Sequence, residues 1–480
     1  MKVDKLNTKI IGITSLASAC LIVIIFLVVN SINLSTRNNK SIIILDINGN
    51  EIYRTEENLN KAIEDKVIIK NNGVADSIIS QVILDLQNEQ ELSFDEAIRL
   101  LNSKELKIYS TIDMTIQEKL NDYFNDRTIF TTTKNSTFNQ AAMVIMDYEG
   151  NVKAVAGGNN EDTSKNRATT ELIKVGSTIK PISIYSLAVE KDLINFSTII
   201  DDVPGNTTFS GEVIEWPTNY DNKYEINVTI TQALKKSKNT IAVRVGEIIG
   251  QEAVFDFLKN KLNYSTLVES KTGDTDKQLS ALALGYFTRG ITLDTLVSSY
   301  SMIGNGGYYS GKRYYTKVID SNGDVLISNE DSKARVISEE TATIMNRLLL
   351  NNIVDEDSII KDIKIDEVEV LGKTGTVGND RGENVSQLFV GMTPDYIAGV
   401  WVGYDDGRAL MQDLYNHPTK IWQSVMSNIE LKNNDFKLSN NVKKLDYCSE
   451  SGLLKSDSCK NIKIGYYKES NIPDICNIHN

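Results

Sequence analysis

The sequence is poor in histidine and has no stripe of basic residues. Only two of its 480 residues are histidines, His417 and His479, so a mechanism built on a histidine base has few candidates. The net charge is −13, which would repel the phosphate backbone of a nucleic acid. We therefore expect no nucleic-acid partner, and we look for a catalytic base of another kind.

Cysteine is also scarce, and most of it lies in one place. Cys20 falls in an apolar stretch near the N-terminus, whereas Cys448, Cys459 and Cys476 all lie near the C-terminus. Three thiols allow one disulfide and leave one thiol over. The spacing Cys476-Asn-Ile-His479 hints at a metal site, but the separation of Cys448 and Cys459 does not fit a zinc knuckle. We therefore expect no metal site.

Charge is missing altogether from residues 10–29, IIGITSLASACLIVIIFLVV, which are enough to span a bilayer as a helix. Lys2, Lys5 and Lys9 precede this run, and positive charge favours the cytoplasmic side. A cleaved signal peptide would have a shorter apolar core and a small-x-small cleavage site, which does not stand out here. We predict a cytoplasmic tail over residues 1–9, an uncleaved transmembrane anchor over 10–29, and the remainder beyond the membrane.

The segment after the apolar run, residues 30–110, is expected to form a pedestal or linker. SIIILDINGNEIY predicts two short strands around an Asn-Gly turn. Residues 74–102 show the periodicity of helices, and Ser93 with Glu96 forms a capping box before an apolar run. The pedestal would hold the following domain away from the membrane.

Residues 111–435 are expected to form the main domain, followed by a cysteine-containing tail over 436–480. Asp113 predicts the start of a helix, and AAMVIMDYEGNVKAVAGG predicts two strands. Helical stretches follow from 177 to about 300, including ITQALKKS and TIAVRVGEIIG, and three strand-like runs come after them, EVEVLGKTGTV, SQLFVGM and YIAGVWVGY. Strands at both ends with helices between them indicate an α+β fold, in which the first and last strands meet in one sheet.

The first candidate for chemistry is Ser177-Thr-Ile-Lys180, which Pro181 follows. If a helix begins at the serine, the proline falls in its first turn, where it costs little, and the serine and lysine share one face. A desolvated lysine beside another cation can be neutral enough to activate a serine. A helix cap followed by a solvated lysine is the alternative, and Ser358-Ile-Ile-Lys361 shows that the spacing also occurs elsewhere.

The second candidate is Ser237-Lys238-Asn239, between two helical stretches. Residues two apart do not share a helix face, so this triplet predicts a turn from which Ser237 and Asn239 can both point into a cleft. The serine would relay protons and the asparagine would bind a substrate amide. Alone the signal is weak, because residues 164–166 repeat the same tripeptide.

The third candidate is Lys373-Thr374-Gly375-Thr376, at the end of a strand-like run. Strand alternation puts the two threonine hydroxyls on one face, where they suit a substrate carboxylate. The glycine leaves room for a ligand along the strand. The lysine supplies a cation that attracts the carboxylate and lowers the pKa of the lysine in the first motif. Residues 271–273 repeat Lys-Thr-Gly among turn-forming residues and are set aside.

The order of the three motifs, on a helix start, a helix–helix turn and a strand, resembles that of penicillin-binding proteins and serine β-lactamases. From about residue 106 onward the chain resembles the transpeptidase half of class A, bifunctional penicillin-binding proteins, as in NRATTELIKVGSTIKP, ITQALKKSKNTIAVRV and GMTPDYIAGVWVGYDDG. The resemblance implies a penicillin-binding, β-lactamase-like transpeptidase fold, an antiparallel sheet flanked by helices, behind one transmembrane helix.

The resemblance also implies a D,D-transpeptidase that cross-links peptidoglycan stem peptides ending in D-Ala-D-Ala, through a serine acyl-enzyme that β-lactams also form. The serine of the first motif would be the nucleophile, its lysine the base, and backbone N–H groups of the first and third motifs the oxyanion hole. No cofactor is implied. The implied catalytic residues are Ser177, Lys180, Ser237, Asn239 and Lys373, and the implied substrate-binding residues are Thr374, Gly375 and Thr376.

The resemblance places the chain in a bacterial cell membrane, with one span and its catalytic domain outside, and suggests a separate glycan polymerase as partner. The short segment before residue 106 leaves no room for the family's glycosyltransferase domain, so we expect no glycan polymerisation. Leu388 stands where the family usually has tryptophan, and Val175 where it has proline, which bears on substrate preference. A D,D-carboxypeptidase, and a catalytically weak scaffold or β-lactam-binding protein, remain alternatives.

Overall fold

The computed structural model describes residues 41–55, 59, 73–126, 140–159, 165–209, 212–270, 273–330, 333–358, 360–410 and 418–479. The expected anchor over residues 10–29 lies outside these ranges, as do His417 and the lysine and threonine of the repeat at 271–273. Within these ranges, no helix is both long and apolar enough to cross a membrane.

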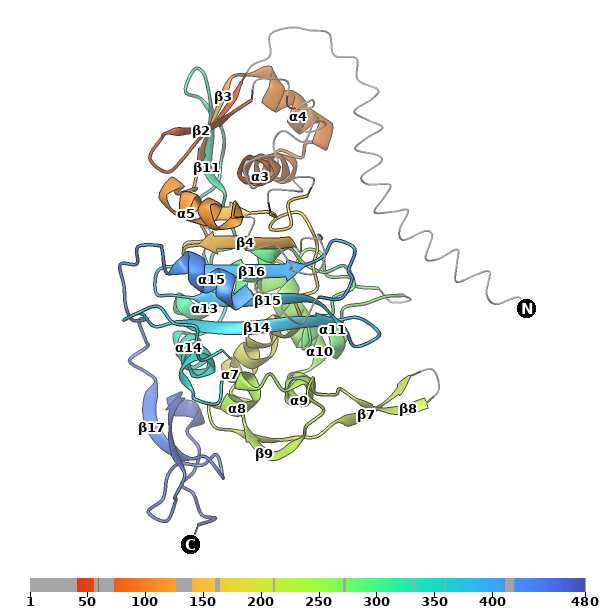
Figure 1. Ribbon diagram of the computed structural model, residues 1–480, viewed down its shortest axis with the longest axis vertical. Helices are drawn as coiled ribbons and strands as arrows, with labels where there is room; N and C mark the ends of the chain where they lie inside the picture. The colour runs from red at the N-terminus through yellow and green to blue at the C-terminus, as the bar shows by residue number, and fades with distance from the viewer. Residues whose placement is uncertain are drawn as a thin grey trace, which may run out of the picture.

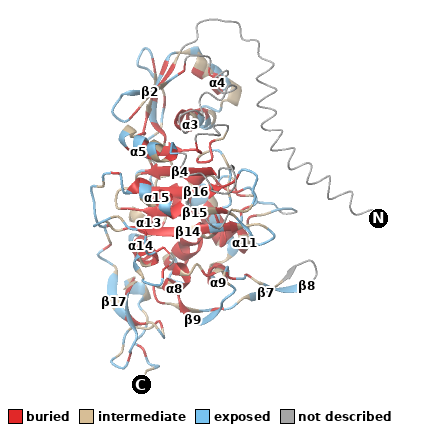
Figure 2. Ribbon diagram, in the orientation of Figure 1, coloured by how far each residue is buried: buried red, intermediate tan, exposed pale blue. Residues whose placement is uncertain are grey.

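The centre of the molecule is a five-stranded antiparallel sheet (Figure 1). Strand β4, from the first half of the chain, pairs with β16, from the last part, so the expected meeting of first and last strands is confirmed. Every residue of β4 and of β16 is buried, and Figure 2 shows the middle of this sheet in red. Its order is β14 (Leu371–Gly378), β15 (Asn384–Met392), β16 (Ile397–Gly403), β4 (Gln140–Met146) and β5 (Val152–Ala156).

Side-chain alternation along β4 explains why helices cover both faces of the sheet. Ala141, Met143 and Ile145 belong to one apolar cluster, which α5 (Met114–Phe124) and α15 (Pro418–Met426) complete. The residues between them point to the opposite face and join a larger cluster. That cluster includes helix α12 (Leu293–Ser299), which packs on β4 and β16.

The larger cluster on the second face contains the helices that position the candidate site. They are η2 (Gly176–Ile179), η3 (Pro181–Tyr185), α7 (Ser186–Glu190), α8 (Ile230–Lys235), α9 (Asn239–Ile249), α10 (Gln251–Asp256), η4 (Phe257–Lys261), α11 (Leu279–Leu282), α13 (Ser301–Gly304) and α14 (Glu339–Val354). Short strand pairs connect them, namely β6 (Ile199–Asp202) with β9 (Glu225–Thr229), β7 (Gly205–Phe209) with β8 (Glu212–Trp216), and β10 (Tyr308–Tyr309) with β13 (Ala334–Arg335).

The strand expected over EVEVLG begins later than the sequence suggests. Ile365 and Val368 form an isolated bridge across a turn, in which Glu367 has a φ of +64°. A left-handed residue ends an extended run, so β14 starts only at Leu371 and this part of the prediction was wrong. The part of the strand that carries Lys373 to Thr376 is present as expected.

The pedestal is built around a second five-stranded sheet, of order β12-β11-β3-β1-β2. Strand β11, from later in the chain, pairs with β3, and β12 pairs with β11. The sequence analysis did not assign these two later strands to the pedestal. The capping box is confirmed, because Ser93 Oγ accepts from Glu96 N and Ser93 N donates to Glu96 Oε2. The elements are β1 (Ile42–Leu45), β2 (Glu51–Arg54), α3 (Val74–Glu89), α4 (Phe94–Ser103), β3 (Leu106–Ser110), β11 (Tyr315–Asp320) and β12 (Val325–Ser328).

The C-terminal tail forms a hairpin of β17 (Lys443–Cys448) and β18 (Ile462–Tyr467), followed by η5 (Glu469–Asn471), at the end of the molecule opposite the pedestal (Figure 1). Tyr447 and Tyr467 each pack edge-on against Phe196, with ring centroids 6.4 Å apart. The tail is therefore docked on the main domain by aromatic contacts.

Candidate active site

Ser177 lies in the short 3-10 turn η2, with its side chain half-buried. The expected helix start is confirmed in position, but its form differs: η2 is followed by the π-helical segment η3, which Pro181 begins. The hydroxyl of Thr178 donates to the carbonyl of Val175 at 2.6 Å and holds this turn.

Glycines allow the nucleophile turn to press directly against β14. Gly176 has a φ of +54°, and a Cβ there would lie 2.5 Å from the carbonyl oxygen of Thr376. A Cβ on Gly375 would lie 2.6 Å from the carbonyl oxygen of Val175. Gly285, which the sequence reading did not single out, also has a positive φ, and a Cβ there would clash with the backbone of Gly176. The first and third motifs thus meet through backbone.

Lys180 is fully buried, and its amine is held by the second motif. Its Nζ donates to the carbonyl oxygen of Ser237 at 2.6 Å and to Oδ1 of Asn239 at 2.7 Å, and lies 3.4 Å from Ser237 Oγ. Burial, and then the charge of Lys373, hold the pKa of this lysine well below its ordinary value, although Asp202 opposes them. A lysine in this setting can be neutral and accept a proton.

Ser237 occupies the predicted turn between α8 and α9, where it has a φ of +54°. Its hydroxyl lies between two amines, because Lys373 Nζ donates to it at 3.0 Å while Lys180 approaches from the other motif. Lys373 also donates to the carbonyl of Thr374 at 3.0 Å, and burial lowers its pKa to about 7. A strained serine shared by two buried lysines is typical of a functional site.

Asn239 is fixed by residues that the sequence analysis did not select. Its side-chain amide donates to the carbonyl of Thr218 at 2.8 Å, and its backbone N–H donates to Oδ1 of Asn219 at 2.8 Å. Asn219 in turn donates to Asp202 at 2.6 Å. The segment 216–224 therefore sets the orientation of the amide group that faces Lys180.

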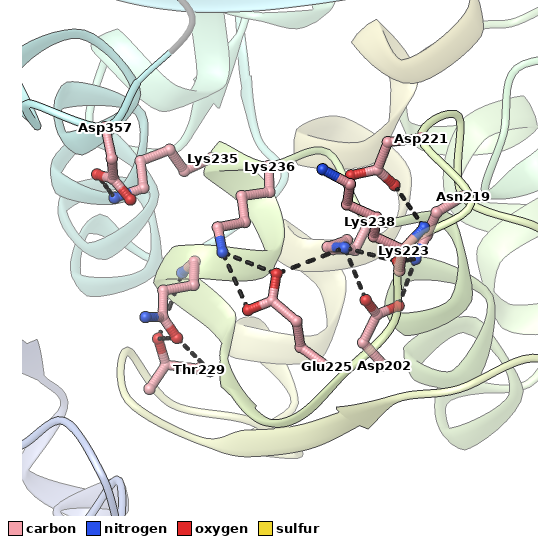
Figure 3. Close-up of polar contacts among 11 residues, drawn as sticks. Asp202, Asn219, Asp221, Lys223, Glu225, Thr229, Lys235, Lys236, Lys238 and Asp357 are labelled. Carbon is pink, nitrogen blue, oxygen red and sulfur yellow. Dashed lines mark hydrogen bonds and ion pairs between the residues drawn. The ribbon is translucent and has the colours of Figure 1, made fainter.

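Lys238, the middle residue of the second motif, contacts acidic side chains, because its amine reaches Asp202 and Glu225 (Figure 3). Its Nζ lies 2.8 Å from Asp202 Oδ2 and donates to the carbonyl of Lys223 at 2.9 Å. Thr240 also donates to Asp202. Both members of the Lys238–Asp202 pair are almost completely buried. No local signal identified Asp202, because its partners lie distant in the sequence.

The two threonines of the third motif face the open side of β14. Thr374 is half-buried and Thr376 is exposed, as strand alternation predicts, and β14 is an edge strand of the central sheet. Neither hydroxyl makes a hydrogen bond with another of the described residues. Both are therefore available to a ligand beside the strand.

The expected contact between Ser177 and Lys180 is not made in this structure. Within the described residues the Ser177 hydroxyl has no hydrogen-bond partner, because the lysine amine is turned to Ser237 and Asn239. Catalytic hydrogen bonds are often open in ligand-free enzymes and form only when substrate binds. A contact between the two side chains would require the amine to leave the second motif.

In the two repeated motifs, polar side chains make hydrogen bonds that stabilise the fold. Ser358 is buried and its hydroxyl donates to the carbonyl of Asn352, while Lys361 is exposed, so the pair is not a nucleophile and base. Asn166 donates to the carbonyl of Gly73 at 3.1 Å and ties the main domain to the pedestal.

Comparison with known proteins identifies this arrangement. Residues 141–406 match the family described as "Penicillin binding protein transpeptidase domain". The chain belongs to this penicillin-binding protein family. The resemblance to class A members is confirmed by the relatives: penicillin-binding protein 1A of Clostridium acetobutylicum is 30% identical over 454 residues, which cover 89% of this chain and 53% of that protein.

Other members of the penicillin-binding protein family are similarly related. Penicillin-binding protein 1A of Clostridium perfringens is 28% identical over 404 residues, which cover 79% of this chain and 47% of that protein. The chain spans about half the length of the curated relatives it matches. Two penicillin-binding proteins of known structure share the fold.

Penicillin-binding protein 1A from Haemophilus influenzae has a TM-score of 0.65 at 16% identity, covering 92% of this chain and 99% of that one. PonA1 from Mycobacterium tuberculosis has a TM-score of 0.61 at 21% identity, covering 75% of this chain and 94% of that one. A PonA1 structure in complex with penicillin V is also similar. The penicillin-binding transpeptidase fold expected from the sequence is therefore confirmed.

Proposed function

We propose that this penicillin-binding protein is a serine D,D-transpeptidase, with Ser177 as nucleophile, and that β-lactams acylate the same serine. Family membership supports peptidoglycan cross-linking and β-lactam binding in general. The observation that carries the specific proposal is the convergence of two buried amines, from Lys180 and Lys373, on the hydroxyl of Ser237. The arrangement supplies a base, a proton relay and a cation in one site.

In the proposed acylation step, Ser177 Oγ attacks the carbonyl carbon of the penultimate D-alanine, and neutral Lys180 takes the hydroxyl proton. The backbone N–H groups of Ser177 and Thr376 stabilise the oxyanion. The peptide C–N bond then breaks, and the departing D-alanine amine receives a proton through Ser237, so the base is regenerated. An acyl-enzyme ester on Ser177 remains.

Substrate binding uses the open side of the site. Lys373, Thr374 and Thr376 bind the terminal carboxylate, whose negative charge favours the protonated form of Lys373. Gly375 lets β14 lie close to the turn that carries Ser177, since a Cβ there would meet the Val175 carbonyl and not the ligand side expected from the sequence. Asn239 accepts or donates a hydrogen bond to the peptide amide once Lys180 releases it. No metal or organic cofactor takes part in these steps.

In the proposed second step, an amine from a neighbouring stem peptide attacks the acyl-enzyme carbonyl. The amine loses a proton to Lys180, the ester C–O bond breaks, and Ser177 recovers its proton. A cross-link forms and the free enzyme returns. If water replaces the amine, the same steps give a D,D-carboxypeptidase, and a donor-peptide assay with and without an acceptor amine separates the two reactions.

We also propose that residues 10–29 anchor the protein in a bacterial cell membrane, because this run has no charge and follows three lysines. Residues 30–110, joined by β11 and β12, would serve as the pedestal, the rest of 111–435 as the catalytic domain and 436–480 as its tail. A cross-linking enzyme needs nascent glycan, so a glycan polymerase is the proposed partner.

The test uses the full chain in detergent, incubated with fluorescent penicillin, with intact mass and gel fluorescence read over time. We expect one adduct per chain, lost in Ser177→Ala. The matched control is Ser358→Ala, which removes the other serine with a lysine three residues later and should keep full labelling. Labelling of a folded Ser177→Ala variant, or no adduct on the folded wild-type chain, would overturn the proposal.

A further inference from the structure

Four groups of the kind that bind metal ions converge in the C-terminal tail. Cys448 lies at the end of β17, Cys459 in the loop before β18, and Cys476 and His479 close to the C-terminus. Their ligand atoms, three sulfurs and one imidazole nitrogen, all lie within 4.8 Å of one another. The four residues come from three separate segments of the tail, which meet at this point.

The spacing of these atoms matches a tetrahedral metal site. With a metal–sulfur distance of about 2.3 Å, the sulfurs of a tetrahedral site lie about 3.8 Å apart, within the spread of this cluster. Cys448 Sγ lies 3.2 Å from His479 Nε2. All three thiols are free and buried. One disulfide would use only two sulfurs and would leave the third thiol and the imidazole without a role.

The surroundings of the sulfurs provide donors that stabilise thiolates. Ser451 Oγ donates to Cys476 Sγ at 3.2 Å, and the backbone N–H of Ser456 lies 3.3 Å from Cys459 Sγ. Donors of this kind support the ligands of structural metal sites. Glu450 lies 3.3 Å from the same nitrogen of His479. Its side chain is 46% exposed, so it can turn to solvent when a metal takes that nitrogen.

Beyond the contacts of Tyr447 and Tyr467 with the main domain, the tip of the tail has little apolar packing to hold it in shape. Its sheet has only two strands, which are marginally stable by themselves. The apolar cluster at its tip consists of the three cysteines, with Leu453 packed against them. A hydrophobic core of this size is too small to order the last residues, and small units of this kind are commonly completed by a metal or by disulfides.

We propose that Cys448, Cys459, Cys476 and His479 form a structural zinc site that fixes the C-terminal tail. Three thiolates and one imidazole in a tetrahedral arrangement favour Zn²⁺ among the common divalent metals. Four protein ligands close the coordination sphere, so the metal holds structure and takes no part in catalysis. The sequence analysis expected no metal site. The residue spacing alone does not reveal that Cys448 and Cys459 lie close to Cys476.

Hydrogen bonds also connect the loop of the proposed site with the main domain. Gly452, in the loop between Cys448 and Cys459, accepts a hydrogen bond of 2.6 Å from the Ser197 hydroxyl, and Tyr467 donates to the same hydroxyl at 2.9 Å. Ser197 lies just before β6, the strand that ends at Asp202. The zinc therefore fixes the loop that contacts Ser197, and Ser197 lies next to the strand that carries Asp202.

The test is metal analysis of the full chain, purified in detergent without chelator. We expect about one zinc per chain, together with four alkylatable thiols and no disulfide after unfolding in chelator. Cobalt added to the metal-free protein should give the absorption of tetrahedral thiolate coordination, and zinc should abolish it. Cys459→Ser and His479→Gln should each lose most of the metal.

The chain offers matched controls, because it has one further cysteine and one further histidine. Cys20→Ser and His417→Gln should each retain the zinc. Labelling by fluorescent penicillin reports whether each variant is folded, and His479→Gln changes only the penultimate residue. A disulfide between two tail cysteines in the freshly purified protein would overturn the proposal. So would wild-type protein that binds neither zinc nor cobalt, or a His479→Gln variant with unchanged metal content and cobalt spectrum.

Discussion

Lys238 and Asp202 form an ion pair with an N–O distance of 2.8 Å although their side chains are 2% and 0% exposed. The pair anchors the turn that carries Ser237 and Asn239. Replacing one partner of a buried pair leaves the other charge without compensation, which costs about 3–5 kcal/mol. We therefore expect Lys238→Met to lower the free energy of unfolding by that amount, measured by denaturant titration, and to abolish penicillin acylation.

The control for this prediction is Lys236→Ala, two residues earlier. Lys236 also forms an ion pair, at 2.8 Å to Glu225, but the two side chains are 34% and 44% exposed. Solvent-exposed pairs contribute less than about 1 kcal/mol, so this variant should keep its stability and its acylation rate. Equal losses in the two variants would contradict the role given to the buried pair.

The contact between Gly176 and β14 should be intolerant of any side chain. An alanine at 176 would place its Cβ 2.5 Å from the Thr376 carbonyl oxygen, on a residue with a φ of +54°. Strain and overpacking together should cost about 2–4 kcal/mol and move the nucleophile away from the third motif. Thermal unfolding and fluorescent-penicillin labelling should both reveal the loss in Gly176→Ala.

Gly382→Ala separates the steric effect from the conformational one. Gly382 has a φ of +75°, but a Cβ there would meet nothing within 4 Å. Only the left-handed penalty of about 1–2 kcal/mol remains, and acylation should be unchanged. If Gly176→Ala behaves like Gly382→Ala, the close approach of the two motifs is not required.

Ser237→Ala should slow acylation without unfolding the protein. The hydroxyl is the atom on which the amines of Lys180 and Lys373 converge, and a positioned proton-transfer group contributes about 10²–10⁴-fold to a rate. Alanine tolerates the backbone conformation about as well as serine, so the melting temperature should change little. Stopped-flow measurement of penicillin acylation checks the rate, and an unchanged rate constant would remove Ser237 from the mechanism.

The pH dependence of acylation should be bell-shaped. Lys180 must be neutral to act as base, so the rate falls at low pH as this lysine gains a proton. Burial, and then the charge of Lys373, lower the pKa of Lys180, so this fall occurs well below the pH at which an ordinary lysine gains its proton. Lys373 must be charged to bind the carboxylate, so the rate falls at high pH, with an apparent pKa of about 7 in the free enzyme. The two groups interact, so the measured values belong to the pair.

The measurement is the second-order acylation rate constant across the pH range, with a carboxylate-bearing penicillin. Lys373→Met should lose the alkaline limb together with most of the rate, because no titrating cation remains at that position. A wild-type profile that only rises with pH would show that the charge of Lys373 is not needed.

Much of the fold was predictable because its signals are local. The capping residues Ser93 and Asp113 mark helix starts, and each is confirmed by a hydrogen bond to the first turn. The turn at Ser237 follows from helical patterns on either side. The start of β14 was misplaced because EVEV has strand composition, whereas Glu369 instead pairs with Arg347 at 2.7 Å, a partner that no local pattern reveals.

The sequence by itself determined the three motifs, their order and their local settings, because helix starts, turns and strands depend on neighbouring residues. Only the tertiary structure decided that the Lys180 amine rests on Ser237 and Asn239 rather than on Ser177. It alone brought Asp202 beneath the second motif and gathered the ligand groups of the tail. These contacts join residues that are distant in the chain, and packing, rather than local propensity, sets which of them meet.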